Sequence, residues 1–434
     1  MPARLDARKR GFAAAFDRLL SAKRESAADV NAVVADIVAA VRTHGDRALI
    51  DYTRRFDGFA VTPGRLRVTD AEIARAVKQC DPAALRALKL AARRIRDFHA
   101  RQLPADLSVD DPAGIKLGLR WTAVAAAGLY VPGGTAAYPS SVLMNAIPAR
   151  VAGVARLVMV VPTPQGKLNP LVLAAARLAG VDEIYRVGGA QAVAALAYGT
   201  PTIRPVDKIV GPGNAFVAAA KRQVFGQVGI DMIAGPSEIL VVADGANDPR
   251  WIAADLLSQA EHDASAQSIL MTDDARFADA VERAIEDHLK TLSRAAIARA
   301  SWAKFGAVIL VRRLAEAVPL IDRLAPEHLE LAVAKPEALA GKIRNAGAIF
   351  LGRFTPEALG DYIAGPNHVL PTARSARFSS GLGVLDFMKR TSLIACDLKG
   401  LAALGPATMT LARAEGLDAH VLSIAVRLKT PRRT

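Results

Sequence analysis

The chain has 434 residues, of which 52% are hydrophobic, and a formal net charge of +14. A chain of this length can bury roughly three quarters of its unfolded surface, in about two to four domains. No apolar stretch approaches the roughly 18 residues of a membrane helix, and Met1 to Ser26 lack the apolar block of a signal peptide. These features predict a cytoplasmic protein with no membrane association.

The positive charge raises the possibility of nucleic-acid binding, because Lys and Arg displace counterions from a phosphate backbone. The basic residues are mixed with acidic ones, however, and aromatic residues, at 5%, are too few to provide stacking platforms. The small basic cluster Lys429 to Arg433 is typical of a frayed terminus. We therefore expect no nucleic-acid partner, and keep a basic nucleic-acid-binding protein as the alternative of a different class.

Residues 1–118 are predicted to be mainly helical, because apolar residues recur at helical spacing. From Trp121 the pattern changes to short β-branched runs, each followed by Gly or Pro and an Ala- and Leu-rich helical stretch. This alternation predicts parallel βαβ units. The expected strands form a first set at residues 123–131, 157–161, 183–187, 208–210 and 239–242, and a second set at 268–271, 307–311, 329–333 and 348–351.

The predicted fold class is therefore α/β, with two doubly wound parallel-sheet (Rossmann-like) domains and small helical additions at both ends. We expect residues 1–118 to pack on the second α/β unit. The first α/β domain is expected at 119–236 and the second at 237–375. The end of the chain is expected to be a loop-rich stretch at 372–390 followed by a short helical piece. Residues 376–434 are assigned to a C-terminal extension.

Three glycine-bearing turns follow strands of the first set, at Val131 to Gly134, Val187 to Ala190 and Gly211 to Asn214. Glycine lets backbone amides approach a phosphate, and a helix that begins there directs its positive dipole end toward the charge. Phe216, however, stands where a dinucleotide fingerprint has a third Gly or Ala. The turns support a nucleotide site, with ordinary tight turns as the alternative.

Two polar pairs are candidates for chemistry in the second set. Gln259 and His262 lie three residues apart near the end of a predicted helix, so their side chains share one face and could bind one metal ion. Only two cysteines occur, far apart, so a metal must use His, Asp, Glu or Gln. Glu327 and His328 place a carboxylate beside an imidazole, a pair that can move protons near neutral pH. Joint chemistry requires this pair to lie in a turn, since neighbours in a strand point to opposite faces.

Further polar residues stand in loop-like regions near the C-terminus. Asp361 and His368 lie in a Gly- and Pro-rich stretch, and Glu415 and His420 lie close together in the last part of the chain. Local spacing cannot connect these residues with Gln259 or Glu327. The remaining histidines are predicted to be solvated on charged helix faces; they are His44, His99 and His288.

Taken together, six segments resemble histidinol dehydrogenases. They occur in the order typical of that family and are Gly128 to Thr135, Gly211 to Asn214, Ala234 to Glu238, Leu257 to His262, Ala325 to Leu329 and Asn367 to Thr372. Two positions next to these segments depart from the family pattern. Asp263 stands where Gly often follows the Glu261-His262 pair, and Pro366, before Asn367, stands where Thr is frequent. Neither departure removes a functional group.

The resemblance implies one zinc ion per subunit and an acid-base pair at Glu327 and His328. The implied zinc ligands are Gln259, His262, Asp361 and His420. The implied contacts to a nicotinamide cofactor are Tyr130, Gln191 and Asn214. The implied contacts to the substrate are Ser237, Gln259, His262, His328, Asp361, Glu415 and His420.

The reaction that the resemblance implies is the oxidation of L-histidinol through an aldehyde to L-histidine, the last step of histidine biosynthesis, with two NAD. It also implies an intertwined homodimer, in which the C-terminal extension carries Glu415 and His420 to the active site of the partner subunit. The closest alternative is a paralogue that keeps the zinc and NAD machinery and oxidises another polar alcohol, such as a sulfonated diol.

Overall fold

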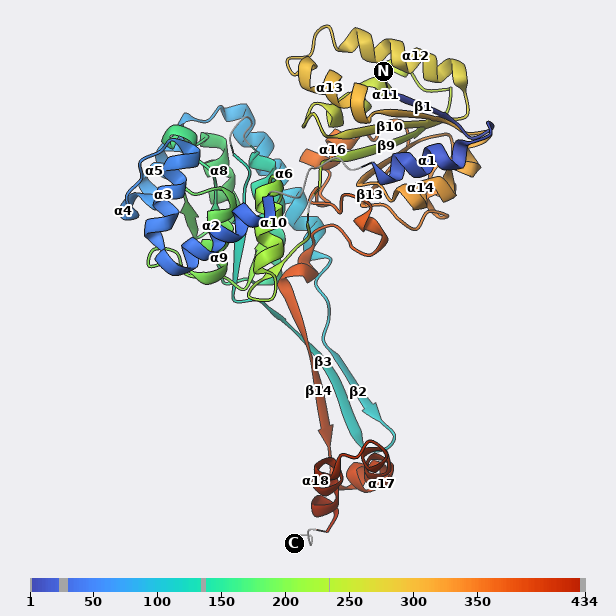
Figure 1. Cartoon of the computed structure of the whole chain (residues 1–434). Helices are drawn as coiled ribbons and strands as arrows, with labels where there is room; N and C mark the ends of the chain where they lie inside the picture. The colour runs from blue at the N-terminus through green and yellow to red at the C-terminus, as the bar shows by residue number, and fades with distance from the viewer. Residues whose placement is uncertain (1, 23–29, 134–137, 234, 430–434) are drawn as a thin grey trace. The chain divides into compact units, whose positions relative to one another are not determined.

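The computed structural model describes residues 2–22, 30–133, 138–233 and 235–429 (Figure 1). The predicted glycine turn at Val131 to Gly134 and the Ala234 to Glu238 segment therefore lie partly outside the described residues. The chain divides into two compact units, one formed by Met1–Gln102 with Ala125–Phe387 and the other by Leu103–Val124 with Met388–Thr434. The first unit contains two parallel sheets covered by helices, which confirms the predicted α/β class.

The first sheet has five parallel strands in the order β6-β5-β4-β7-β8. The strands are β4 (Ala126–Tyr130), β5 (Arg156–Val160), β6 (Glu183–Tyr185), β7 (Lys208–Val210) and β8 (Gly229–Ile230). The connecting helices are α7 (Pro139–Ala152), α8 (Pro170–Ala179), α9 (Gly189–Tyr198) and α10 (Ala215–Val224). Side chains on both faces of the central strand β4 are buried, as expected for a parallel sheet between helices.

The second sheet has six parallel strands in the order β1-β11-β10-β9-β12-β13. The strands are β1 (Ala3–Asp6), β9 (Glu238–Ala243), β10 (Gln267–Thr272), β11 (Ala307–Leu310), β12 (His328–Ala332) and β13 (Ala348–Leu351). The helices around this sheet are α11 (Pro249–Ala260), α12 (Ala275–His288), α13 (Ala295–Phe305), η2 (Leu314–Ala317), α14 (Val318–Leu324) and α15 (Pro336–Ala340).

The strand predicted at residues 239–242 belongs to this second sheet, and its assignment to the first set was wrong. Its alternate side chains join two different cores. Ile239 and Val241 pack with α11 and α12 on one face, and Leu240 and Val242 pack with α14 on the other. An uninterrupted apolar run such as this one fits the centre of any parallel sheet, so its composition alone does not say which sheet it joins.

The N-terminal region divides between the two sheets and differs from the expectation that it packs on the second α/β unit. Strand β1 pairs in the second sheet, and α1 (Phe12–Ser21) packs against it with Phe16 buried in the core. The following helices are α2 (Val30–His44), α3 (Asp46–Asp57), α4 (Pro63–Leu66), α5 (Asp70–Gln79) and α6 (Pro82–Ala100). Helix α2 contacts α9 and α10, while α5 and α6 contact α8, so this group covers the first sheet (Figure 1).

The second unit contains a three-stranded antiparallel sheet that the sequence patterns did not predict. Its strands, in the order β14-β3-β2, are β14 (Met388–Cys396), β3 (Ile115–Ala123) and β2 (Leu107–Asp111). Helices α17 (Leu398–Ala414) and α18 (Asp418–Leu428) follow and contact each other (Figure 1). Among the helices of the described residues, none combines the length and the apolarity needed to cross a membrane.

Candidate active site

Glu327 and His328 lie where the chain enters β12, beside the first residue of β9. Glu327 stands in a bend before the strand, so its side chain can turn toward that of its neighbour, and Glu327 Oε2 lies 3.7 Å from His328 Nδ1. The backbone of Glu238 holds both groups. Its N–H donates to Glu327 Oε2 at 2.8 Å, and its carbonyl oxygen lies 2.9 Å from His328 Nδ1.

This contact fixes the tautomer of the neutral His328 imidazole. A carbonyl oxygen can only accept, so Nδ1 must donate to Glu238 and Nε2 keeps its lone pair. Nε2 lies 3.5 Å from Asp361 Oδ1, and Glu357 Oε1 lies 3.6 Å from Nδ1. Burial alone would lower the pKa of His328, but the carboxylates of Glu357, Glu327 and Asp361 raise it to about 10.

Helix α16 (Glu357–Tyr362) carries two carboxylates toward His328. Glu357 and Asp361 are four residues apart and therefore share one helix face. Burial raises the pKa of Glu357 to about 8, whereas that of Asp361 is lowered because His328 outweighs its burial. Ligand atoms of His328, Glu357 and Asp361 lie within 4.8 Å of one another, close enough to share a metal ion.

Two of the predicted metal ligands stand at the carboxyl end of α11. Gln259 is buried, and its Oε1 has no hydrogen-bond partner among the described residues. His262 follows the helix end. The pKa of His262 is lowered, first by desolvation, while the Asp361 carboxylate opposes this shift and His328 adds to it. His262, Asp361 and His328 therefore lie near enough to interact electrostatically.

The other residues predicted for this site are Ser237, near the Glu327-His328 pair, and Glu415 and His420, in the second unit. Ser237 directly precedes β9, is partly buried, and accepts the N–H of Gln267 through its carbonyl oxygen at 2.9 Å. Glu415 ends α17 and His420 lies in the first turn of α18. Both side chains are exposed and belong to the second unit.

Two carboxylates at α16, those of Glu357 and Glu330, were not predicted from the sequence. Glu357 hydrogen-bonds Ser258 Oγ at 3.1 Å, and its backbone N–H donates to Glu330 Oε1 at 2.5 Å. Glu330 is buried, and its pKa is raised well above the usual value by burial and by Asp255. The spacing of Glu357 and Asp361 behind Pro356, a helix-opening residue, was the signal that could have identified Glu357.

The predicted nucleotide residues lie at the carboxyl ends of strands in the first sheet. Tyr130 ends β4, and its buried hydroxyl accepts the N–H of Gly189 at 3.0 Å; burial raises the pKa of Tyr130 to about 12. Gln191, in the first turn of α9, is buried with its Oε1 lacking a hydrogen-bond partner among the described residues. Asn214 caps α10 by accepting the N–H groups of Phe216 and Val217.

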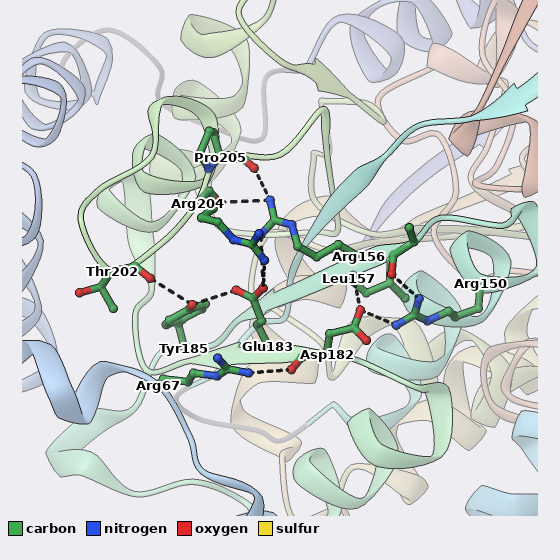
Figure 2. A network of polar contacts seen from close by, with 11 residues as sticks. Arg67, Arg150, Arg156, Leu157, Asp182, Glu183, Tyr185, Thr202, Arg204 and Pro205 are labelled. Atoms are coloured by element: carbon green, nitrogen blue, oxygen red, sulfur yellow. Dashed lines mark hydrogen bonds and ion pairs between the residues drawn. The ribbon is translucent and has the colours of Figure 1, made fainter.

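The amino end of the same sheet carries a different polar cluster, shown in Figure 2. Glu183 accepts from Arg204 at 2.9 Å and from the Tyr185 hydroxyl at 2.9 Å. Arg150 binds Asp182 and also donates to backbone carbonyl groups. These arginines serve the fold, which accounts for part of the basic composition without a polyanionic ligand.

Comparison with known proteins decides the family. The family model described as histidinol dehydrogenase matches residues 20–428. The chain belongs to the histidinol dehydrogenase family. It is 71% identical over 429 residues to the histidinol dehydrogenase of Rhodospirillum rubrum and 66% identical over 428 residues to that of Bradyrhizobium diazoefficiens, with 99% of each chain covered.

A solved structure supports the same family. The chain is similar to the crystal structure of histidinol dehydrogenase from Elizabethkingia anophelis, with a TM-score of 0.94, 36% identity, and coverage of 99% of this chain and 98% of that one. Membership in the histidinol dehydrogenase family makes the chain an NAD-dependent oxidoreductase of histidine biosynthesis.

Proposed function

We propose that the chain oxidises L-histidinol through L-histidinal to L-histidine, with one zinc ion per subunit and two NAD consumed in succession. The observation that carries this proposal is the His328 imidazole, which has Nδ1 committed to Glu238 and Nε2 turned toward Asp361, with Glu327 beside it. An imidazole base, His328, with the carboxylate of Glu327 beside it suits two successive proton transfers. The proposed location of the enzyme is the cytoplasm.

The residues present fit a zinc ion. Gln259, His262 and Asp361, together with His420 of a second subunit, offer two imidazoles and two oxygen donors, a plausible zinc set. The buried Gln259 Oε1 without a hydrogen-bond partner among the described residues supports this role, because such an atom is costly unless a ligand binds it. The carboxyl end of α11 adds a favourable dipole for a cation. Bound there, zinc would orient the imidazole and amine of histidinol.

The protein side chains then divide the proton transfers between them. His328 is placed to accept the proton of the substrate's alcohol hydroxyl at Nε2, and NAD, when bound, would supply the hydride acceptor for the carbon that bears this hydroxyl. Glu327 then activates the water that adds to the aldehyde, and a second hydride transfer gives the acid. Binding of Asp361 to a cation would offset one of the three carboxylates that raise the pKa of His328, which favours the neutral imidazole that this role requires.

The proposed enzyme is a homodimer in which each C-terminal extension, residues 376–434, completes the site of the partner with Glu415 and His420. Ser237 and Glu415 are proposed substrate contacts. The exposed apolar side chains of the second unit support such an interface, since contiguous patches of this kind mark association surfaces. They include Leu107, Val109, Leu117, Leu393, Ile394, Leu404, Leu411, Leu417, Leu422 and Val426.

The experiment mixes two inactive variants, His262→Ala and His420→Ala, unfolds them together and allows them to refold. Half of the sites in a mixed dimer would contain every native ligand, so partial recovery of histidinol oxidation is expected, with zinc content rising in parallel. Proven mixed dimers without recovery would overturn the shared site. Measuring NADH production with a panel of alcohols that includes a sulfonated diol tests the substrate. Activity confined to the sulfonated diol would show that histidinol is not the substrate.

A further inference from the structure

A buried ion pair lies behind the Gly211 to Asn214 turn. Lys221, in α10, and Asp231, just after β8, form an ion pair, and their side chains are 2% and 1% exposed. Both partners also bind the backbone of Gly211. Lys221 Nζ donates to the Gly211 carbonyl oxygen at 3.0 Å, and the Gly211 N–H donates to Asp231 Oδ2 at 2.7 Å. The two charges therefore hold both polar backbone groups of one residue.

The turn that this pair holds has little conformational freedom. Gly211 has φ +112°, and a Cβ atom at this position would lie 2.1 Å from the backbone oxygen of Tyr130, so no side chain fits. At Gly213 a Cβ atom would lie 2.4 Å from Val217. The turn is thus packed closely against β4 on one side and α10 on the other.

A buried ion pair is an expensive way to stabilise a core, because apolar residues of similar volume usually serve as well or better. Its two charges are useful where a definite geometry must be kept. We infer that Lys221 and Asp231 are positioning residues that hold the Gly211 to Asn214 turn in the conformation that binds the phosphates of the nicotinamide cofactor. The inference rests on the nucleotide site proposed at this turn, and it adds two residues that do not themselves touch the cofactor.

The test is Lys221→Met, which keeps much of the side-chain length and removes the charge. The Km for NAD and the dissociation constant of NADH, measured by fluorescence titration, are expected to rise about tenfold, because the turn must then be ordered by binding. The kcat and the KM for histidinol are expected to stay within about twofold, since the second sheet is untouched. Hydrogen exchange of residues 206–216 should become faster.

Asp231→Asn is the second variant, because its amide oxygen can still accept the Gly211 N–H while the charge of Lys221 loses its partner. An intermediate loss of NADH affinity is expected. If Lys221→Met proves too unstable to purify, this variant and the double change Lys221→Met with Asp231→Leu carry the same measurements. Unchanged NADH affinity in the folded variants would overturn the positioning role.

Two controls separate this inference from the nucleotide site itself. Glu183→Gln weakens an ion pair at the opposite end of the same sheet and should lower the melting temperature without changing NADH affinity. Asn214→Asp keeps the helix cap but places a carboxylate at the turn, so it should weaken NADH binding strongly if the phosphates lie there. Weaker binding in Asn214→Asp but not in Lys221→Met rejects the positioning role alone. Unchanged binding in both rejects the proposed site.

Discussion

The two parallel sheets of the first unit present opposite ends to their candidate ligands. In the first sheet, Tyr130 is the last residue of β4, and Asn214 follows the carboxyl end of β7, where α10 begins. In the second sheet, His328 and Ser237 lie at the amino ends of β12 and β9, near the carboxyl end of α11. Helix beginnings favour anions and helix ends favour cations. The difference suits phosphates at the first edge and a metal ion at the second.

Both edges use the N–H and the carbonyl oxygen of a single residue, but for opposite purposes. At Gly211, two side chains hold the backbone, and the backbone forms the proposed binding surface. At Glu238, the backbone holds two side chains, and these carry out the proposed chemistry. Changes at the second edge should therefore affect turnover, and changes at the first should affect cofactor affinity.

The largest effect is expected for His328→Asn. The Asn side-chain amide can still donate to the Glu238 carbonyl, but it cannot accept the alcohol proton. The kcat should fall about 10³-fold, in the range of a lost general base. NADH affinity should not change, because the first edge is intact. His44→Asn, at an exposed position, is the matched control. A large loss of NADH affinity in His328→Asn would break the division between the two edges.

The next effect concerns the support of α16. Glu330→Gln keeps an oxygen that accepts the Glu357 N–H, and it resembles the protonated acid that the raised pKa of Glu330 favours. Its activity should stay within about threefold of the wild type. Glu330→Leu removes the acceptor and should lower kcat/KM about 10²-fold, since a shift of α16 misplaces Glu357 and Asp361. Equal losses in both folded variants would show that the carboxylate charge, rather than the hydrogen bond, matters.

Substitution of Asp231, whose side chain is buried, and of the partly buried Asp255 should change the stability of the protein in opposite directions. Asp231→Asn leaves Lys221 without a counter-charge and should lower the free energy of unfolding by about 3 kcal/mol at pH 7.

Asp255 lies next to another acid, and burial raises its pKa to about 6. Because the folded pKa exceeds the unfolded one, its stabilising contribution is present at low pH and is lost as the pH rises from about 4 to about 6.

Asp255→Asn should abolish this pH dependence. The variant is expected to gain about 2 kcal/mol relative to the wild type between pH 4 and pH 7, measured by urea unfolding at each pH. Glu183→Gln provides a control with a carboxylate that is paired with arginines. A parallel pH profile for the wild type and Asp255→Asn would contradict the assignment.

Local patterns predicted the parallel sheets well because their strands are short apolar runs separated by Gly and Pro. The strands at 208–210 and 348–351 coincide with β7 and β13. The strand at 239–242 was assigned to the wrong sheet, since pairing between distant strands leaves no local signal. Strand β14 was missed because its side chains are largely exposed and no apolar alternation marks it. Strand β3 does alternate apolar residues from Ile115 to Trp121 with polar residues or glycine, and this strand signal was overlooked.

The candidate site was predicted unevenly for a related reason. Glu327 and His328 are adjacent in the chain, and Pro326 marks the bend that lets them act together. Glu330 and Asp255, by contrast, are polar residues within apolar elements, and only the fold shows that they meet beside α16. Family resemblance supplied the proposed zinc ligands, which lie far apart in the sequence. The two positioning residues of the Gly211 turn were not predicted at all, because Lys and Asp are usually solvated.

The smallest expected effect concerns His99, which lies outside both sheet edges. It tests how the stability of the fold, rather than the activity, depends on pH. His99, predicted to be solvated, is fully buried in α6, with Nδ1 bonded to the Ile95 carbonyl at 2.8 Å. Burial lowers its pKa, so the unfolded chain binds this proton more readily, and stability should fall as the pH drops below about 6.5, by up to about 1 kcal/mol per pH unit. His99→Gln should flatten this fall, whereas the exposed control His44→Gln should not. Equal acid sensitivity in all three proteins would place the proton uptake elsewhere, with the buried groups around α16 as the next to examine.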